Sequence, residues 1–511
     1  MILALSRFEL PMAPTPAPGL ALSAPSSAPS SAPSAASPGG VRPGPAPCLA
    51  GLDRAPFRWS GRHQDQLPVR LRGVVPAWLR GDLVRTAPAL FEQNGWRADH
   101  WFDGLGLLYG FRFDAAGVSF RQRLLDSQVA ADAAQGQSRL ASFGTRTRRS
   151  RIGRLLQPVP QATDNTNVNV IPWQGAWLAL TESQHQHVID PDDLASRGLV
   201  HYEDGLPAGL MMTAHPHFDH ASKALVNVGT SLGRRNQLLV FRQKPGESKR
   251  QIEGSLSLER SPYLHDFGVS ERHVVLIDHP LRISGLSMLF SNRSLMEHHR
   301  WEPEQGTRLR LLDRQSGRWT TYETDTCFCF HTVNCFDDGE DVVFDFLAYG
   351  DASVVSALGT EALASGQRPV LTPRYLRARL RPGGGRVELE PLSPQGFEFP
   401  AIAYRQQHGQ PYAVAWGASF AGSSWQSQLL RVEAGQVRRF EQEGMTYGEP
   451  IFVPHPQGES PSDGVILSVG CHLNEPRSAL VILDAGQMLP IAHCEVDLSL
   501  PLGFHGNFQA R

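Results

Sequence analysis

Cysteine, lysine and long apolar runs are all scarce in this sequence of 511 residues. Six cysteines are too few for a disulfide framework, and three of them crowd into residues 327–335, which indicates reduced thiols in a cytosol-like compartment. No apolar run reaches the ~18 residues of a membrane-spanning helix. The net charge of −2 provides no broad basic surface, which argues against a nucleic acid as the main partner.

Helical periodicity is scarce as well, and its main occurrences are residues 127–143 and 359–365. Elsewhere, short β-rich runs alternate with glycine, proline, aspartate and asparagine, and pairs of runs at 111–120, 309–322 and 378–389 predict hairpins. This pattern indicates an all-β fold, which could be a sandwich array, a large barrel or a propeller. The length suits seven blades, although no repeat of roughly 40 residues is visible.

Residues 1–50 differ in composition from the rest of the chain. They are rich in proline, alanine and serine, and such a segment cannot bury enough apolar surface to offset the entropy of ordering. We therefore expect a disordered extension at 1–50 and one folded domain at 51–511.

A cytoplasmic location is expected from the reduced thiols and the lack of a membrane-spanning run. An organellar address in the extension is the alternative, although its proline density disfavours an amphipathic transit helix.

Four of the 19 histidines lie in unusual surroundings, at the ends of apolar runs and beside proline, glycine, aspartate or asparagine. This context predicts strand ends or tight turns. The four are His215, His265, His331 and His505. No local motif connects them, so they could meet only if several inner strands of a ring face one axis. Taken singly, each is more simply interpreted as a hydrogen-bonded structural histidine.

A rival local site lies in the segment CFCFHTVNC. On a strand, alternation would place Cys327, Cys329 and His331 on one face, with Cys335 following them. Thiolates and imidazoles suit zinc. However, the spacing is not that of a zinc knuckle, and residues two apart on a flat strand diverge too little to surround a tetrahedral ion. Buried free thiols are the simpler interpretation.

Several segments together resemble the carotenoid cleavage oxygenase family. In chain order they are HWFDGLGLLYGFRF, TDNTNVNV, TAHPHFD, YLHDFGVSERHVV, FHTVNCFDDGEDVVFD, GFEFPAIAY, YGEPIFVPHP and GFHGNF. The resemblance extends from residue 55 to 511, and several segments are most similar to the branch of animal β-carotene oxygenases and retinoid isomerohydrolases. It implies an all-β, seven-bladed β-propeller with a helical cap over one face.

The resemblance also implies a metal site. By motif, the four histidines would be ligands of Fe(2+), and His217 is the less favoured neighbour of His215. Four neutral imidazoles would leave positions open for O2. Each buried ring needs an acceptor for its second N–H, which a carboxylate supplies. Three glutamates match the family's outer layer, without a prediction of which histidine each one meets: Glu182, Glu398 and Glu449.

The implied activity is that of a dioxygenase. It would add O2 across one double bond of a carotenoid or apocarotenoid and release two carbonyl products, such as apocarotenals or retinal. Retinoid isomerohydrolases and stilbene-cleaving enzymes are alternatives with the same fold. Stilbene cleavage needs a lysine ahead of the first ligand, and none precedes Lys223. A propeller that binds a carotenoid without turning it over is a third alternative. The sequence predicts neither the scissile bond nor the oligomeric state.

A polyene substrate needs an aromatic tunnel. Taken singly, each candidate wall residue is more simply interpreted as hydrophobic core. The candidates are Trp101, Phe102, Phe218, Phe267, Phe330, Trp416 and Phe504. Such a substrate dissolves in lipid, and residues 281–301 fall where the family has a membrane-facing patch. A monotopic membrane surface and a buried cap helix are equal alternatives for this segment. Its apolar residues are Leu286, Met288, Leu289, Phe290, Leu295 and Met296.

Overall fold

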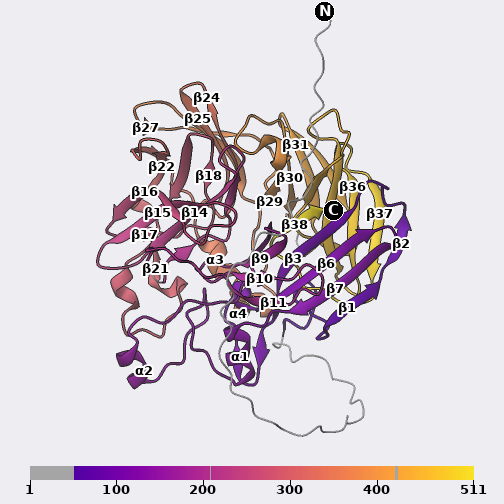
Figure 1. Ribbon diagram of the computed structural model, residues 1–511, viewed down its shortest axis with the longest axis horizontal. Helices are drawn as coiled ribbons and strands as arrows, with labels where there is room; N and C mark the ends of the chain where they lie inside the picture. Colours follow the sequence, from indigo (N-terminus) through magenta and orange to yellow (C-terminus); the bar gives the residue numbers. More distant parts are fainter. Residues whose placement is uncertain (1–50, 208, 421–423) are drawn as a thin grey trace, which may run out of the picture.

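Seven sheets of four to six strands follow one another along the chain, with two smaller sheets beside them. The computed structural model describes residues 51–207, 209–420 and 424–511, so the expected extension at 1–50 lies outside the described residues. The sheets surround a common centre, and the last, yellow strands return beside the first, indigo ones (Figure 1). This arrangement is the predicted seven-bladed propeller.

Blades one to four take most of their strands from consecutive parts of the chain, and only β38 and β27 come from further along it. Blade one contains β1 (Gln64–Pro68), β7 (Gly117–Leu124), β6 (Leu105–Asp114), β3 (Gly81–Leu90) and β38 (Gly506–Ala510). Blade two contains β11 (Ser196–Leu199), β10 (His187–Ile189), β9 (Ala176–Leu180) and β8 (Asn169–Trp173). Blade three contains β12 (Met211–Met212), β13 (His217–Asp219), β14 (Ala224–Ser231), β15 (Asn236–Gln243) and β16 (Gln251–Leu258). Blade four contains β18 (Gly268–Val269), β19 (His273–Asp278), β22 (Thr307–Asp313), β23 (Trp319–Thr324) and β27 (Gly385–Arg386).

The remaining blades complete the ring. Blade five contains β24 (Thr332–Asp338), β25 (Asp341–Ala348), β26 (Arg374–Leu380) and β28 (Leu389–Pro391). Blade six contains β29 (Glu398–Ala401), β30 (Val414–Ser419), β31 (Gln428–Glu433) and β32 (Gln436–Glu441). Blade seven contains β2 (Arg70–Gly73), β37 (Pro490–Val496), β36 (Ser478–Asp484), β35 (Gly464–His472), β33 (Met445–Tyr447) and β34 (Ile451–Pro454). The smaller sheets are β17 (Ser261–Pro262) with β20 (Leu281–Ile283) and β21 (His299–Trp301), and β4 (Glu92–Gln93) with β5 (Trp96–Arg97).

Both ends of the described chain close the ring. The C-terminal β38 pairs antiparallel with β3, so that Asn507 lies opposite Val84. The early strand β2 pairs antiparallel with β37, so that Leu71 lies opposite Cys494. Strands from the two ends of the chain therefore complete blades one and seven, which fixes the last residues of the chain beside the propeller axis rather than leaving them to fray.

The blade strands form because their side chains alternate between two buried or half-buried faces. In β22, Leu309 and Leu311 are buried, while Arg308 and Arg310, which alternate with them, are half-buried. The middle strands of the blades are covered on both faces by neighbouring blades, and β6 and β25 are accordingly apolar over most of their length. This double burial gives the long apolar runs that the sequence shows at these positions.

The three predicted hairpins are confirmed. Phe111 faces Phe120 between β6 and β7, and Leu309 faces Tyr322 between β22 and β23. The third is more complex: Ala378 faces Leu389 between β26 and β28, but β27, which lies in the connection, pairs in parallel with β23 of the preceding blade.

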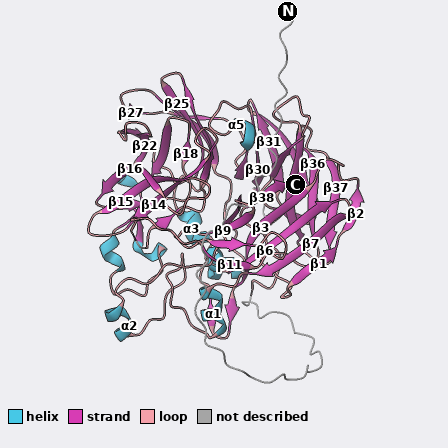
Figure 2. Cartoon of the chain, in the orientation of Figure 1, coloured by secondary structure: helices cyan, strands magenta, loops and turns pink. Residues whose placement is uncertain are grey.

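Several of the short helices, with many loops, lie in the lower part of the view, while the helix Tyr404–Gln407 lies in the upper part (Figure 2). The α-helices are α1 (Gln128–Ala134), α2 (Arg151–Leu156), α3 (Ser353–Ala357), α4 (Thr360–Ala364) and α5 (Tyr404–Gln407). The 3-10 helices are η1 (Trp101–Asp103), η2 (Gly285–Met288), η3 (Met296–His298) and η4 (Pro303–Gln305). The two sequence stretches with helical periodicity contain α1 and α4. Within the described residues, no helix has the length and apolar character needed to span a membrane.

The alternative of a buried cap helix at residues 281–301 is wrong. This segment contains β20, η2, η3 and β21, separated by turns. Of its apolar residues, Leu286, Leu289 and Phe290 are exposed by 42–56%. Met288 is buried, and Leu295 and Met296 are half-buried. The segment thus presents part of its apolar surface to solvent and part to the interior.

Candidate metal centre

The four histidines singled out from the sequence meet at the centre of the ring. One ring nitrogen from each of His215, His265, His331 and His505 lies within 4.8 Å of all the others. The Nε2 atoms of His215 and His265 are 3.1 Å apart, and those of His331 and His505 are also 3.1 Å apart. Four residues from four blades thus converge on one point.

Their positions follow from the blade architecture. Each histidine comes one to three residues before a strand at the edge of its sheet, namely β13, β18, β24 or β38. In a propeller these edge strands surround the axis, so the residues that enter them face it. Gly506, beside His505, is needed for close approach, because a Cβ there would lie 2.5 Å from the backbone oxygen of Val84.

Each of the three predicted glutamates contacts one histidine. Glu182 Oε1 lies 2.6 Å from Nδ1 of His265. Glu398 Oε2 lies 2.5 Å from Nδ1 of His331. The structure thereby assigns two of the pairs that the sequence left open.

The third pair joins Glu449 and His505, with 2.7 Å between Oε1 and Nδ1. His215 has no carboxylate at hydrogen-bonding distance from its ring among the contacts of the described residues. Its backbone N–H donates to Thr213 Oγ1 at 3.3 Å. One of the four rings is therefore held without a glutamate.

The hydrogen bonds to glutamate decide the chemistry of the rings. A carboxylate accepts, so Nδ1 of His331 and of His505 each carries a proton, and Nε2 in the neutral ring is left as a bare lone pair. Two such lone pairs 3.1 Å apart cannot hydrogen-bond to each other. A cation between them removes the repulsion, and neutral imidazoles are common metal ligands. The residues present therefore fit a divalent metal ion.

Electrostatics favour neutral rings at two of the four positions. Burial, together with the neighbouring imidazoles, holds the pKa of His215 and of His505 well below the ordinary value. Burial also disfavours protonation of His331, but the adjoining Glu398 carboxylate outweighs it and raises the pKa of that ring. Burial raises the pKa of Glu449 to about 7, against the opposing effect of Arg85.

The cysteine-rich segment does not build a second metal site. Cys327, Cys329 and Cys335 are buried in the apolar core between blades four and five. Burial raises the pKa of the Cys327 thiol to about 11, so it stays protonated. Within the described ranges, the histidine cluster is the one group with the spacing to hold a metal. The three thiols are therefore core side chains, which was the simpler interpretation.

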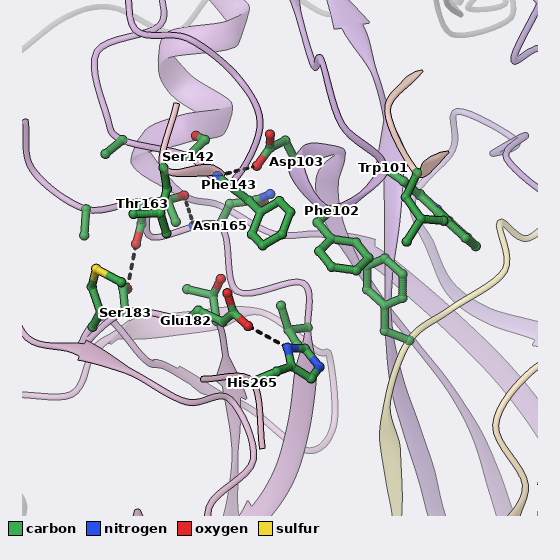
Figure 3. Close-up of a pocket in the computed structure, with 18 of the residues that line it drawn as sticks. Trp101, Phe102, Asp103, Ser142, Phe143, Thr163, Asn165, Glu182, Ser183 and His265 are labelled. Atoms are coloured by element: carbon green, nitrogen blue, oxygen red, sulfur yellow. Dashed lines mark hydrogen bonds and ion pairs between the residues drawn. The ribbon is translucent and has the colours of Figure 1, made fainter. Parts of the chain in front are cut away.

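A cavity of about 440 Å³ extends from the histidine cluster to η1 and the loops at 141–143 and 159–163. His265, His331 and His505 line its inner end. In Figure 3 the Glu182 carboxylate points to His265, and the rings of Trp101, Phe102 and Phe143 lie on the other side of the same space. The cavity is therefore a mainly apolar chamber with the histidine cluster at one end.

Four of the seven predicted wall residues line this cavity, namely Trp101, Phe102, Phe330 and Phe504. Phe218, Phe267 and Trp416 do not. Trp416 is fully buried and stacks on Phe452, with 4.7 Å between ring centroids. Phe267 is also fully buried, with its ring 4.9 Å from that of His217. Trp416 and Phe267 therefore belong to the packing between strands, as the core interpretation has it, and are not tunnel residues. Phe218 is half-buried and is not among the residues that line this cavity.

The sequence reasoning missed four aromatic wall residues: Phe143, Tyr349, Phe399 and Phe420. Phe399 follows Glu398 directly, and on a regular strand the two would face opposite sides. A φ of 55° at Phe399 and a register shift in β29 break that alternation, so both side chains reach the cavity. The block GFEFP was a signal that this strand is special, but it did not specify the bulge.

Asp103 is a further buried group that the sequence did not identify. Its carboxylate accepts hydrogen bonds from the backbone N–H groups of Phe143 and Gly144 at 2.9 and 2.7 Å, and from Thr145 Oγ1 at 2.7 Å. It lies at the end of η1, next to Phe102. Asp103 therefore ties the loop that carries Phe143 to η1, whose Phe102 ring lies 4.9 Å from that of Phe143.

Comparisons with known proteins agree with this architecture. The family model described as retinal pigment epithelial membrane protein matches residues 57–510. The mitochondrial carotenoid-cleaving dioxygenase of Mustela putorius furo is 25% identical, with 91% of this chain and 96% of that protein aligned. The β,β-carotene 15,15'-dioxygenase of Mus musculus is 27% identical, with 87% and 89% aligned. Cobalt-substituted Synechocystis ACO has a TM-score of 0.78 at 22% identity, covering 90% of this chain and 98% of its own, which confirms the propeller fold.

Proposed function

Because the chain belongs to the retinal pigment epithelial membrane protein family, that of the carotenoid cleavage oxygenases, we propose that it is an Fe(II)-dependent dioxygenase of carotenoids or apocarotenoids. The observation that carries the proposal is the convergence of four imidazoles, within 4.8 Å of one another, at the end of an apolar cavity. The ferret and mouse relatives are carotenoid dioxygenases by name and align over nearly their whole length. The proposed reaction would take place at the end of the cavity that the histidines line.

The side chains have distinct roles in this proposal. His215, His265, His331 and His505 would hold the metal through their Nε2 atoms. Three of the rings are oriented by Glu182, Glu398 and Glu449, whose negative charges also offset that of the ion. When bound, Fe(2+) would supply the one-electron chemistry that lets O2 react with a closed-shell polyene. All-imidazole ligation leaves the ion its full charge and coordination positions for O2.

The cavity wall would position the polyene. Phe330 lies 5.3 Å from the ring of His265, and Phe399 lies 5.6 Å from that of His331 (centroid distances). Flat apolar rings at this distance bury a polyene and exclude water from the reacting carbons. One C=C bond breaks, and each of its carbons gains one oxygen atom of O2, giving two carbonyl products. No outside reductant is required for this balance.

Two related chemistries rank below carotenoid cleavage. The three lysines of the chain, at 223, 244 and 249, are absent from the residues that line the cavity, which disfavours stilbene cleavage by a lysine-assisted route. A retinoid isomerohydrolase would use the same metal and an ester substrate. Incubation with an all-trans retinyl ester, followed by analysis of the isomers, separates this reaction from oxidative cleavage.

A membrane surface is the proposed source of the substrate. The exposed residues Leu286 and Phe290 lie next to α2, because the N–H of Phe290 donates to the Pro158 carbonyl at 2.9 Å. In α2, Ile152, Leu155 and Leu156 are 69–82% exposed. Val159 and Met288, which are close in sequence to these exposed residues, line the cavity. An apolar patch at the mouth of the cavity, with arginines in α2, suits shallow insertion into the lipid interface.

The proposed location is cytoplasmic with peripheral attachment to a membrane. The ferret relative carries "mitochondrial" in its name, so delivery to an organelle by residues 1–50 is the alternative. Fractionation of cells that express the tagged full chain, compared with a chain lacking 1–50, decides between them.

The decisive test of the proposed function combines metal and product analysis. Purified protein reconstituted with ferrous iron is incubated with β-carotene, a long apocarotenal and resveratrol under 18O2, and the products are identified by mass spectrometry. We expect stoichiometric iron, two carbonyl products from a carotenoid or apocarotenal, and one labelled oxygen in each product. Absence of bound iron, or unlabelled products, would refute the assignment.

A further inference from the structure

The three glutamates at the metal centre are each held by another donor in addition to their histidine. Glu398 accepts at Oε2 from His331 and at Oε1 from the phenol O–H of Tyr349, at 2.5 Å. Both carboxylate oxygens of Glu398 are therefore fixed, one by an imidazole and one by a phenol.

The other two glutamates are held by different sets of donors. Glu182 accepts from the Tyr263 hydroxyl at 2.5 Å, on the same oxygen that faces His265. Glu449 Oε2 instead accepts hydrogen bonds from Arg85 Nη1 at 3.1 Å and from the Gly506 N–H at 2.9 Å. Two phenols and one guanidinium thus form an additional layer of contacts around the glutamates.

Both phenols are held rigidly by their surroundings. Tyr263 is 2% exposed and its ring stacks parallel to that of Phe328, with an interplanar angle of 11°. Tyr349 is 9% exposed and its ring packs edge-on against Phe330. The rings cannot turn without displacing neighbours, so each hydroxyl has a fixed position relative to its carboxylate.

The choice of donors also suits the charge of the centre. Three carboxylates beside a divalent ion leave one negative charge, which the buried Arg85 offsets at Glu449. Neutral O–H donors at the other two glutamates add hydrogen bonds without adding charge. A carboxylate that accepts a second hydrogen bond keeps its orientation.

We propose that Tyr263 and Tyr349 are positioning residues of the metal centre. Each phenol O–H fixes a glutamate, and the glutamate in turn fixes the tautomer and the ring angle of its histidine. The inference rests on the proposed function for the presence of a metal, but it concerns metal binding rather than the reaction.

The test measures metal binding by the full-length chain. Apo-protein is titrated with Co(II) and with Fe(II) under anaerobic conditions, in competition with a chelator, for Tyr349→Phe and Tyr263→Phe. Tyr322→Phe is the matched control, because Tyr322 is 2% exposed and its hydroxyl donates to the Arg381 carbonyl at 2.7 Å, away from the centre. We expect about 10-fold weaker metal binding for the two test variants and an altered visible spectrum of bound Co(II). The control should bind as the unmutated chain does.

A merely structural role predicts a different result. In that case all three tyrosine variants would lose thermal stability to a similar extent and keep the Co(II) spectrum and the metal affinity, which would overturn the inference. Tyr349→Phe is also made in a Glu398→Gln background, where the tyrosine should have little further effect on affinity; two full, additive losses would contradict it. If the unmutated chain binds neither metal, the proposed function fails instead.

Discussion

His505 Nδ1 lies 2.7 Å from Glu449 Oε1, although the two residues are on different blades and one of them is close to the C terminus. The same glutamate contacts Arg85 of β3, and Arg85 also donates to the Phe504 carbonyl at 2.9 Å. Arg85 and Glu449 thus contact both the closing segment of the propeller and the histidine cluster. Closure of the ring and assembly of the site are therefore coupled.

This coupling predicts the effect of removing the glutamate charge. Glu449→Gln should weaken metal binding by about 10- to 100-fold, because the amide cannot supply the charge that orients and polarises His505. The amount of metal retained after dialysis against a graded chelator series measures this loss of affinity. Glu441→Gln, on the exposed edge strand β32, is the control and should retain metal normally. Equal retention in the two variants would contradict the role of Glu449.

Loss of a histidine ligand should reduce metal binding more than loss of the glutamate that orients it. His331→Ala should abolish both stoichiometric metal binding and product formation, because the three remaining imidazoles do not enclose the ion. His217→Ala is the comparison: it lies two residues after His215 but contacts Asp266 at 3.2 Å instead of the cluster. This variant should still bind one metal ion per chain. Activity of His331→Ala equal to that of the unmutated protein would show that the ligand set is wrong.

The aromatic residues should separate into wall and core by their response to substitution. Trp416→Ala should lower the free energy of unfolding by about 3–5 kcal/mol, because the indole is fully buried. Phe102→Leu, at the cavity wall, should cost less than about 1.5 kcal/mol but change KM or the ratio of products. Chemical denaturation and product analysis of both variants measure the two effects. A change of product ratio without destabilisation in Trp416→Ala would reverse the assignment.

Stability should fall in acid because of a carboxylate at the ring closure. Burial would raise the pKa of Asp82, but Arg112 and Arg121 outweigh it, so its pKa lies below the ordinary value of 3.8. The carboxylate therefore stabilises the fold above the pKa of the unfolded chain, and this contribution is lost as the pH falls through the lower, folded pKa. Asp82 also contacts Arg511 Nε at 2.6 Å, near the last strand.

Asp82→Asn tests this linkage directly. It removes the negative charge that faces the buried Arg121 and the half-buried Arg112, so we expect a loss of up to about 3 kcal/mol at pH 7 and a flatter dependence of stability on pH below 4. Denaturant unfolding between pH 2 and 7 measures both effects. Asp338→Asn is the control, since Asp338 pairs with Arg379 at an exposed site and should change stability by less than about 1 kcal/mol. Identical pH profiles for Asp82→Asn and the unmutated chain would disprove the linkage.

The apolar patch at the mouth of the cavity should mediate binding to lipid. Leu156→Ser together with Phe290→Ser should reduce co-flotation with phosphatidylcholine vesicles several-fold, because both side chains are exposed. Their exposure also predicts a change in stability within about 0.5 kcal/mol. Val74→Ser, 76% exposed in the loop after β2, is the control. Undiminished flotation of the double variant would exclude this surface as the membrane contact.

The local pattern of the sequence determined the all-β class and the hairpins, and the resemblance to a family indicated the propeller and the four histidines. Strand alternation and turn residues are local properties, and GFHGNF and the other blocks carry their resemblance residue by residue. Only the tertiary structure decided that Glu449 meets His505 and Glu182 meets His265, because these contacts depend on how blades pack around the axis. It also showed that Trp416 lies in the core, and that the bulge in β29 places Phe399 in the cavity beside Glu398. Alternation along a strand fixes which residues share a face, but the packing of the next blade decides what that face meets.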